Sequence, residues 1–307
     1  MPEGPGTILV VDDTPTKLYI LSSWLRRSGH QVLQATGGLE ALAKVRELHP
    51  DLVVLDVRLP DISGHEVCEQ IKADPATASI PVVQISGAAI TPADRAHGLE
   101  RGADAYLAEP VEPDEFTATI EATLRYYRAR QRAERMAGRL AALTEVTLTM
   151  NSAETFDELL TTAVEGASRI LDRQSGTLAL PPDGRVRRYT AMPQAGAATP
   201  QATTPDTLLT LSTMSLGDTA GTQVFTVPAD DWLRLMPDAE IGGDVSGVLC
   251  RTKAGRPAVY LGVEAVPPLD EDESNILRQL GQALALAVDA LRAYAEEHAI
   301  ALTLQRS

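Results

Sequence analysis

Acidic side chains stand where short apolar runs of the first 125 residues end. TILVVDD (7–13) ends in Asp12 and Asp13, and LVVLD (52–56) ends in Asp56. Such runs predict buried strands of a parallel sheet, and the carboxyl ends of parallel strands gather functional groups at one edge. Like charges about 4 Å apart repel by roughly 4 kcal/mol, so these acids predict a bound cation. Oxygen ligands favour Mg²⁺, and a carboxylate beside it can attack a phosphoryl group and become an acyl phosphate.

Each aspartate alone has a simpler interpretation, because strand-end aspartates often cap helices or form turns. Their order along the chain favours a shared site. Five apolar runs alternate with helical stretches, which predicts an α/β fold with a parallel sheet covered on both faces. The predicted strands are 7–13, 31–35, 52–56, 81–86 and 105–108, and the predicted helices are 17–27, 39–48, 65–71, 92–101 and a long one from 113.

Motifs across this region carry a family resemblance. They are VVDD (10–13), LDVRLPDISG (55–64), ISGAA (85–89) and GADAYLAEP (102–110). With them, residues 7–125 resemble the receiver domain of bacterial response regulators, which has a flavodoxin-like, doubly wound parallel fold. The resemblance implies a receiver domain over residues 1–125, in which Asp56 accepts a phosphoryl group that a histidine kinase supplies.

The resemblance also implies roles for individual residues. The implied Mg²⁺ ligands are Asp12, Asp13, Asp56 and the backbone carbonyl of Arg58. Ser86 is expected to turn toward a phosphoryl oxygen, and Tyr106 is expected to move with it as the switch aromatic. Pro110 is expected to follow a cis peptide bond.

Glu109 departs from the family, which carries a lysine at this position. The replacement changes the local charge by two units and adds a fourth acid to the predicted pocket. Glu109 then has a raised pKa, turns to solvent, or strengthens cation binding while opposing an incoming phosphate. A simpler alternative is that Glu109 faces water and another basic residue substitutes for the lysine. We expect Asp56 to be phosphorylated poorly, and the receiver to work partly or wholly without the acyl phosphate.

A long helical linker is predicted over residues 113–150, overlapping the last receiver helix. Its apolar side chains recur at alternating spacings of three and four, which is typical of a coiled coil and predicts a parallel homodimer. The arginine-rich segment 125–139 is interpreted as a solvated flank rather than a nucleic-acid patch, because the rest of the chain is acidic. The heptad positions are Tyr126, Ala129, Ala133, Met136, Leu140, Leu143, Thr147 and Met150.

Residues 151–296 follow a different order of helix, strands and helix, which predicts an α+β domain with a loop over 192–207. The stretch 258–291 resembles the last strand and last helix of a GAF domain, a module that senses small molecules or partners. The ligand stays unknown, and a GAF domain without a ligand stays open. The predicted helices are 156–171 and one from 270, and the predicted strands are 176–180, 186–191, 222–227, 246–252 and 258–265.

The second half of the sequence contains no set of residues typical of a catalytic site. Cys250 is the one candidate for attaching a chromophore, but no histidine follows it, which favours an ordinary strand cysteine. Trp232 either lines a pocket or packs in the core. The only histidine beyond residue 97 is His298, so neither a histidine metal cluster nor a Ser-His-Asp triad is available here.

The last helix reaches residues 297–307 without a capping Gly, Asn or Pro, which suggests a longer chain. IALTLQRS (300–307) resembles the entry to SpoIIE/RsbU-like, PPM-type Ser/Thr phosphatase domains, which implies a C-terminal effector acting on anti-anti-sigma-type proteins. One alternative is a hybrid histidine kinase with His298 as phosphoacceptor, although the flanking acid and Arg-Thr-Pro run of such kinases are missing. Another is a receiver-GAF adaptor without an output enzyme. The chain itself is expected to have no turnover beyond phosphorylation and hydrolysis at Asp56.

Composition limits the partners and the compartment. The formal net charge is −15, which argues against nucleic acid and against anionic membranes as partners. There is no apolar run of membrane-spanning length and no secretory leader. The isolated cysteines Cys68 and Cys250 predict neither a zinc site nor a disulfide framework, so a cytoplasmic protein is expected.

Overall fold

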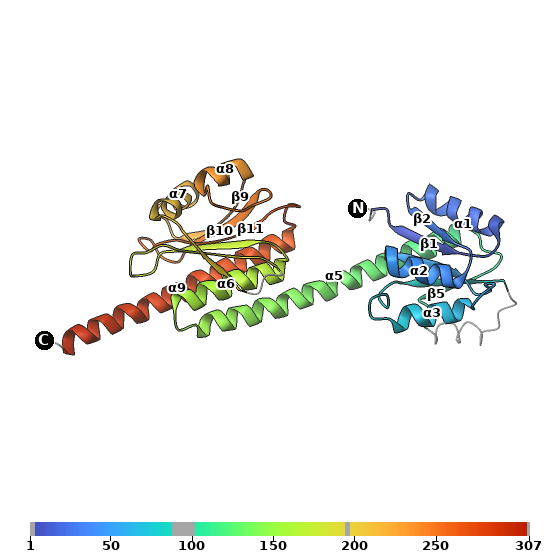
Figure 1. Cartoon of the computed structure of the whole chain (residues 1–307), viewed down its shortest axis with the longest axis horizontal. Helices are drawn as coiled ribbons and strands as arrows, with labels where there is room; N and C mark the ends of the chain where they lie inside the picture. Colours follow the sequence, from blue (N-terminus) through green and yellow to red (C-terminus); the bar gives the residue numbers. More distant parts are fainter. Residues whose placement is uncertain (1–3, 88–101, 194–196, 306–307) are drawn as a thin grey trace. The chain divides into compact units, whose positions relative to one another are not determined.

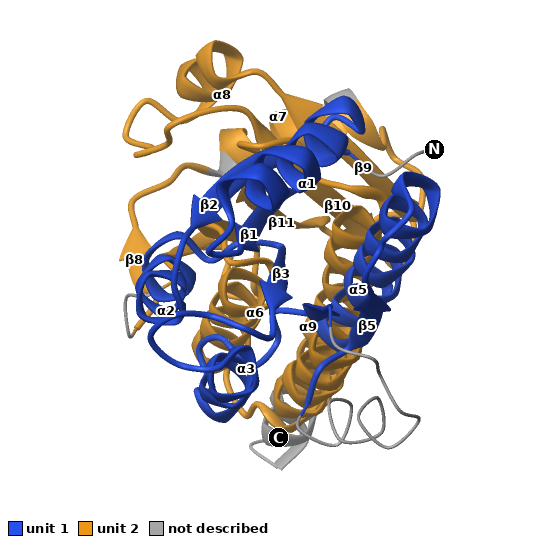
Figure 2. Cartoon of the chain, turned by 90° about the vertical axis from the view of Figure 1, so that its right-hand side faces the viewer, with its two compact units in different colours: residues 1–135 blue, residues 136–307 orange. Residues whose placement is uncertain are grey.

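The computed structural model describes residues 4–87, 102–193 and 197–305 (Figure 1). The chain divides into two compact units, unit 1 over residues 1–135 and unit 2 over residues 136–307 (Figure 2). Helix α5 (Pro113–Ser152) is continuous through this division. No helix in the described part of the chain is both long and apolar enough to cross a membrane.

Unit 1 is built on a parallel sheet of five strands in the order β2-β1-β3-β4-β5. Strands β3 and β4 are buried along their whole length, which explains why they are continuous runs of mostly apolar residues. The parallel five-stranded sheet that the sequence predicted is therefore confirmed. The strand bounds are β1 Thr7–Val11, β2 Gln31–Ala35, β3 Leu52–Asp56, β4 Val82–Ser86 and β5 Ala105–Ala108.

Helices cover both faces of this sheet. α1 (Pro15–Arg27) and the first part of α5 pack on one face, while α2 (Gly38–Leu48) and α3 (Gly64–Ala73) pack on the other. Each helix turns an apolar stripe toward the sheet. The predicted helix 92–101 lies outside the described residues.

The turn after β3 holds helix α3 close to the end of that strand. Ser63 Oγ accepts a hydrogen bond from Glu66 N at 3.2 Å, and the Glu66 carboxylate accepts one from Ser63 N at 2.9 Å. This reciprocal cap fixes where the helix begins. A Cβ on Gly64 would lie 2.2 Å from the carbonyl oxygen of Asp56, so only glycine fits here.

Unit 2 contains an antiparallel sheet of six strands in the order β8-β7-β6-β11-β10-β9. Neighbouring residues of its strands point to opposite faces. Val248 and Leu261 enter one core, and Leu249 and Tyr260 enter another. The strand bounds are β6 Ser175–Ala179, β7 Arg187–Ala191, β8 Thr199–Gln201, β9 Gly221–Val227, β10 Val245–Arg251 and β11 Val259–Glu264.

Two layers of helices enclose this sheet (Figure 1). α6 (Phe156–Leu171), α9 (Glu271–Gln305) and the end of α5 pack on one face. The short helices α7 (Pro205–Ser215) and α8 (Ala229–Leu235) pack on the other. The helix, antiparallel strands and helix that the sequence predicted for this region are all present.

The predicted loop over residues 192–207 is wrong in part. Within it, Thr199–Gln201 form the edge strand β8, which pairs with β7, and α7 begins at Pro205. Helices α7 and α8 were not predicted from the sequence. A strand of three residues is set by pairing with its neighbour rather than by its own apolar alternation, so the pattern could not reveal it.

The second half of the predicted heptad seam has its partner inside unit 2. Leu143 and Met150 of α5 are only 8% and 1% exposed, and they pack with residues of α6 and α9. Gly166 on α6 permits the close approach, because a Cβ there would lie 2.5 Å from Cγ1 of Val146. The prediction that Leu143 and Met150 pair with a second copy is therefore wrong, since an apolar stripe does not say which helix covers it. Tyr126, also assigned to the seam, is 63% exposed.

Candidate functional site

The ends of β1 and β3 bring three aspartates together. One carboxylate oxygen from each of Asp12, Asp13 and Asp56 lies within 4.8 Å of the others. The two strands are adjacent and parallel, so their carboxyl ends meet at the same edge of the sheet. Asp12 and Asp56 are buried, while Asp13 is exposed. The structure thus gathers the three acids that the sequence predicted as metal ligands.

The hydrogen bonds of the two buried aspartates leave oxygens available for a metal. Asp12 Oδ1 accepts from Thr14 N at 2.8 Å, but the buried Asp12 Oδ2 has no hydrogen-bond partner among the described residues. Asp56 Oδ1 accepts from Arg58 N at 3.3 Å. A buried carboxylate oxygen without a donor, beside two further carboxylates, fits a hard divalent cation. Asp12, Asp13 and Asp56 could therefore hold Mg²⁺.

Burial raises the pKa of both Asp12 and Asp56. The backbone N–H groups of Thr14 and Arg58 and the charge of Lys17 oppose this rise without cancelling it. Each folded-state pKa therefore lies above its unfolded value, and the folded unit binds more protons than the unfolded chain. By linkage, the free energy of unfolding falls as pH rises through these folded pKa values. The ionised carboxylates thus destabilise metal-free unit 1 at neutral pH.

Replacing Asp56 by Asn should accordingly raise the free energy of unfolding of metal-free unit 1 at pH 7. The gain should shrink as pH falls, because the wild-type carboxyl becomes neutral as well. Mg²⁺ should raise the melting temperature of the wild type more than that of Asp56→Asn. Thermal unfolding with and without Mg²⁺, read at several pH values, measures all three effects. The exposed Glu47→Gln is the control, and an Asp56→Asn variant less stable than wild type at pH 7 would contradict the expectation.

Glu109 is paired with a lysine that the sequence analysis did not single out. Nζ of Lys17 lies 2.6 Å from Oε1 and 2.8 Å from Oε2 of Glu109. The Glu109 side chain is only 23% exposed, so the alternative in which it turns to solvent is wrong. Gly87 provides the room, because a Cβ there would lie 2.4 Å from Oε2 of Glu109. A basic residue therefore does stand near the acids, but it comes from α1 and not from the end of β5.

Lys17 also acts on the aspartate cluster. Burial alone would lower the pKa of Lys17, but the hydrogen bond and charge of Glu109, together with Asp12 and Asp56, raise it. Lys17 therefore carries its positive charge throughout the neutral range. From the sequence, Lys17 could be placed in the first turn of the helix that follows β1. Nothing in the sequence of that turn indicated that Lys17 pairs with Glu109.

The remaining predicted site residues lie on β4, β5 and the loops beside them. Ser86 ends β4 and is 4% exposed, and its backbone carbonyl accepts a hydrogen bond from Glu109 N at 2.9 Å. Tyr106 is partly exposed on β5, opposite Gln84 of β4. The peptide bond before Pro110 is cis, as the family resemblance implied. The motions expected of Ser86 and Tyr106, and metal binding by the Arg58 carbonyl, stay predictions.

In unit 2 the structure separates the two residues that the sequence singled out. Cys250 lies on β10, 3% exposed, within the core between the sheet and its long helices, and burial raises the pKa of its thiol. Trp232 belongs to the core on the opposite face and lines a pocket. The described side chains end at residue 297, so the side chain of His298 lies outside them.

Comparison with known proteins places unit 1 in a family. Residues 8–121 match the model of the response regulator receiver domain. The chain is 37% identical to Protein PilH of Pseudomonas aeruginosa over 117 residues, which cover 38% of this chain and 96% of PilH. It is 42% identical to the DNA-binding response regulator MtrA of Mycolicibacterium smegmatis over 118 residues, which cover 38% of this chain and 50% of MtrA.

A solved structure of a CheY-like response regulator receiver domain protein from Methanospirillum hungatei JF-1 is 27% identical. The match between the two covers 41% of this chain and 99% of the M. hungatei chain, with a TM-score of 0.39. The chain spans about half the length of MtrA, and the match does not extend into unit 2. Through residues 8–121, the chain belongs to the response regulator receiver family.

Proposed function

We propose that unit 1 is a phosphoryl-accepting switch with Asp56 as its acceptor. The observation that carries this proposal is the set of three carboxylate oxygens within 4.8 Å, which includes an aspartate with an unpartnered buried oxygen. An oxygen of Asp56 attacks the phosphorus of the donor, and the bond to the leaving group breaks with its electron pair on that group. Mg²⁺, when bound to Asp12, Asp13 and Asp56, would offset the charge of the incoming phosphoryl group. A histidine kinase is the expected protein donor.

Lys17 supplies the positive charge that Glu109 cannot. Its ammonium contacts Glu109, and its charge lowers the pKa of Asp12 and Asp56, so it acts electrostatically on the acceptor. In this proposal an incoming phosphoryl group competes with Glu109 for Lys17. The ion pair must loosen first, which is why we expect slow phosphorylation and a receiver that works partly or wholly without it.

Unit 2 is proposed to be a GAF-like sensor that passes the state of unit 1 to a C-terminal effector. A PPM-type Ser/Thr phosphatase acting on anti-anti-sigma-type proteins is the effector that the sequence favours. Support comes from the antiparallel sheet with helices on both faces and from a pocket beneath α8. A hybrid histidine kinase and an adaptor without an output enzyme remain alternatives. The sequence of the gene beyond residue 307 distinguishes the three.

Incubation with acetyl phosphate and Mg²⁺, followed by intact mass, tests the acceptor. We expect slow, incomplete addition of one phosphoryl group to the wild type and none to Asp56→Asn. Glu109→Lys should be labelled faster, because it removes the acid that holds Lys17 and adds a cation. Glu112→Lys makes the same charge change at an exposed position nearby and should behave like the wild type. Labelling of Asp56→Asn to the wild-type extent would overturn the acceptor assignment.

A further inference from the structure

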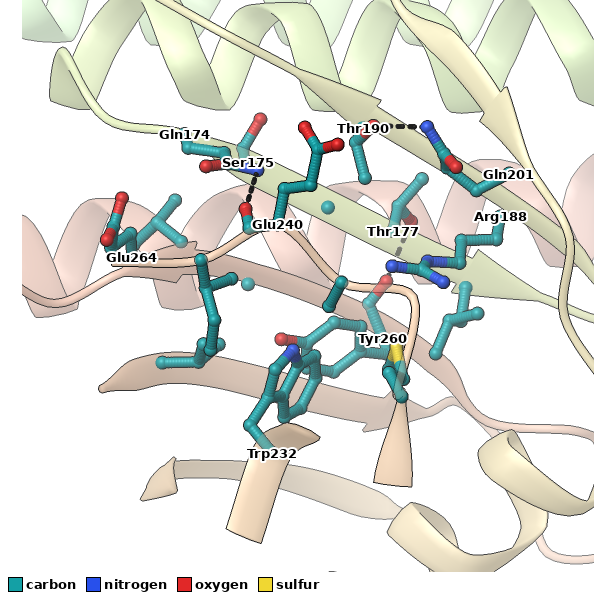
Figure 3. A pocket seen from close by; sticks show the side chains of 18 of the residues that line it. Gln174, Ser175, Thr177, Arg188, Thr190, Gln201, Trp232, Glu240, Tyr260 and Glu264 are labelled. Atoms are coloured by element: carbon teal, nitrogen blue, oxygen red, sulfur yellow. Dashed lines mark hydrogen bonds between the residues drawn. The ribbon is translucent and has the colours of Figure 1, made fainter. Parts of the chain in front are cut away.

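Unit 2 contains a pocket between its sheet and the segment around α8 (Figure 3). Its cavity volume is about 130 Å³. An apolar cavity of about 150 Å³ can hold a benzene molecule, and this pocket is slightly smaller, so it suits a ligand body of no more than one ring. β6, β7, β8 and β11 supply one wall, while Trp232 and residues 238–241 supply the other.

Arg188 of β7 is an exceptional group in this pocket. Its side chain lines the cavity although the residue is only 8% exposed. Among the described residues it makes no ion pair, and its one hydrogen bond runs from Nη1 to the Ala202 carbonyl at 3.4 Å. Burial lowers the pKa of Arg188, and the charge of Asp238 only partly offsets this. A buried guanidinium without a counter-ion is unfavourable, and an anionic ligand would remove that cost.

Two other polar side chains of the pocket already donate hydrogen bonds within the protein. Thr177 Oγ1 donates to the Tyr260 carbonyl at 2.7 Å, and Gln174 Nε2 donates to the Glu240 carbonyl at 2.7 Å. Figure 3 shows the guanidinium of Arg188 extending into the space above the Tyr260 ring. Arg188, with one hydrogen bond of 3.4 Å, keeps donors available for a ligand.

An aromatic floor lies below Arg188. The rings of Trp232 and Tyr260 have centroids 5.4 Å apart, and Tyr260 is 2% exposed. Two glycines make space for the Tyr260 ring. A Cβ on Gly262 would lie 1.8 Å from its Oη, and one on Gly247 would lie 2.4 Å from Cε2. This fixed floor fits a flat, apolar ligand body.

The rim of the pocket is acidic. Asp238, Glu240 and Glu264 line it, and Glu264 Oε1 accepts a hydrogen bond from Gly242 N at 2.6 Å. These carboxylates oppose a ligand with several negative charges, such as a phosphate. A ligand with a single carboxylate meets the least of this repulsion, because its one negative charge pairs with the guanidinium of Arg188.

We infer that this pocket binds a small organic monocarboxylate with a flat apolar body about one ring in size. The inference rests on the proposal that unit 2 is a sensor, and it names the class of ligand that the sensor recognises. The carboxylate pairs with Arg188, and the ring lies against Trp232 and Tyr260.

Three one-ring probes that differ in charge test this inference. They are benzoate, benzamide and benzylamine. The chain has two tryptophans, so ¹⁹F NMR of protein labelled with fluorotryptophan gives separate signals for Trp24 in unit 1 and Trp232 in unit 2. We expect benzoate to shift the Trp232 signal and to bind about tenfold more tightly than benzamide, with benzylamine weakest. The Trp24 signal should not respond.

Arg188→Gln should abolish the preference for benzoate over benzamide, while the exposed Arg185→Gln should keep it. The melting temperature of Arg188→Gln should be no lower than that of the wild type, because the variant loses an uncompensated buried charge. A clearly lower melting temperature would mean that Arg188 has a structural role, and would overturn the inference. Equal affinity for benzoate and benzamide overturns the anion assignment but leaves unit 2 a ligand sensor. If none of the three probes shifts the Trp232 signal, the pocket assignment is overturned. The proposed function of unit 1 still stands in that case if acetyl phosphate labels the wild type but not Asp56→Asn.

Discussion

Replacing Lys17 by methionine is expected to slow the phosphorylation of Asp56 by acetyl phosphate about a hundredfold. The phosphoryl group brings negative charge to a site that already contains Asp12, Asp13 and Glu109. Lys17 is a preorganised cation beside it, and removing one such group from a site of developing negative charge costs about 10²–10³ in rate. Methionine keeps most of the length and apolar surface of the lysine stem, so packing of α1 is nearly unchanged.

The same variant should bind Mg²⁺ more tightly than the wild type does. Lys17 attracts Asp12 and Asp56 and therefore competes with a cation for them. A slower reaction combined with tighter metal binding is a result that a merely structural lysine would not produce. Titration with Mg²⁺, followed by the Trp24 ¹⁹F signal, gives the affinity, and intact mass over time gives the rate.

Exchanging the charges of Lys17 and Glu109 tests the pair from both sides. Lys17→Glu should react even more slowly than Lys17→Met, and adding Glu109→Lys to it should recover much of the rate. Residues that act as a pair give such non-additive effects in a double-mutant cycle. Lys44→Met removes a lysine that pairs with Glu40 on α2 and should leave the rate unchanged. Wild-type labelling by Lys17→Met would show that Lys17 is only the partner of Glu109.

The acid cluster could be predicted from sequence because it depends on strand ends alone. Asp12, Asp13 and Asp56 each follow an apolar run, and parallel pairing of β1 with β3 is enough to bring them together. The Lys17–Glu109 pair could not be predicted, since the partners are 92 residues apart. A lysine on the polar side of an amphipathic helix looks the same whether it meets water or a carboxylate from another strand.

In unit 2, the sequence likewise predicted helices but not which helices contact each other. The apolar spacing of α5 correctly predicted a helix, and Leu143 and Met150 are buried, but Tyr126 and Leu140 of the same pattern are 63% and 48% exposed. The pattern did not reveal that Leu143 and Met150 meet α6 and α9 of their own chain. The pocket was equally hidden, because Arg188 reads as an ordinary polar residue of a strand until β7 and β8 are placed against Tyr260.

Gly64, the last residue of the motif LDVRLPDISG, shows how closely the phosphoacceptor depends on the turn that follows its strand. A Cβ at this position would lie 2.2 Å from the Asp56 carbonyl oxygen and 2.9 Å from Cα of Val57. Both neighbours are backbone atoms next to a buried strand, so neither can rotate away as a side chain could. The carbonyl of Gly64 also accepts a hydrogen bond from Gln84 Nε2 at 3.2 Å, which ties the turn to β4.

Gly64→Ala is therefore expected to lower the free energy of unfolding of unit 1 by roughly 3 kcal/mol. That loss corresponds to a fall in melting temperature of about 10 °C for a unit of this size. The fluorinated Trp24, which packs against Phe116, should report the earlier transition, while Trp232 of unit 2 should report an unchanged one. Gly4→Ala has open space around its Cβ and should match the wild type. Since relief of the clash must move the backbone of Asp56, the variant should also bind Mg²⁺ more weakly below its transition. A Gly64→Ala protein with wild-type stability and wild-type Mg²⁺ affinity would mean that the start of α3 does not constrain the acceptor.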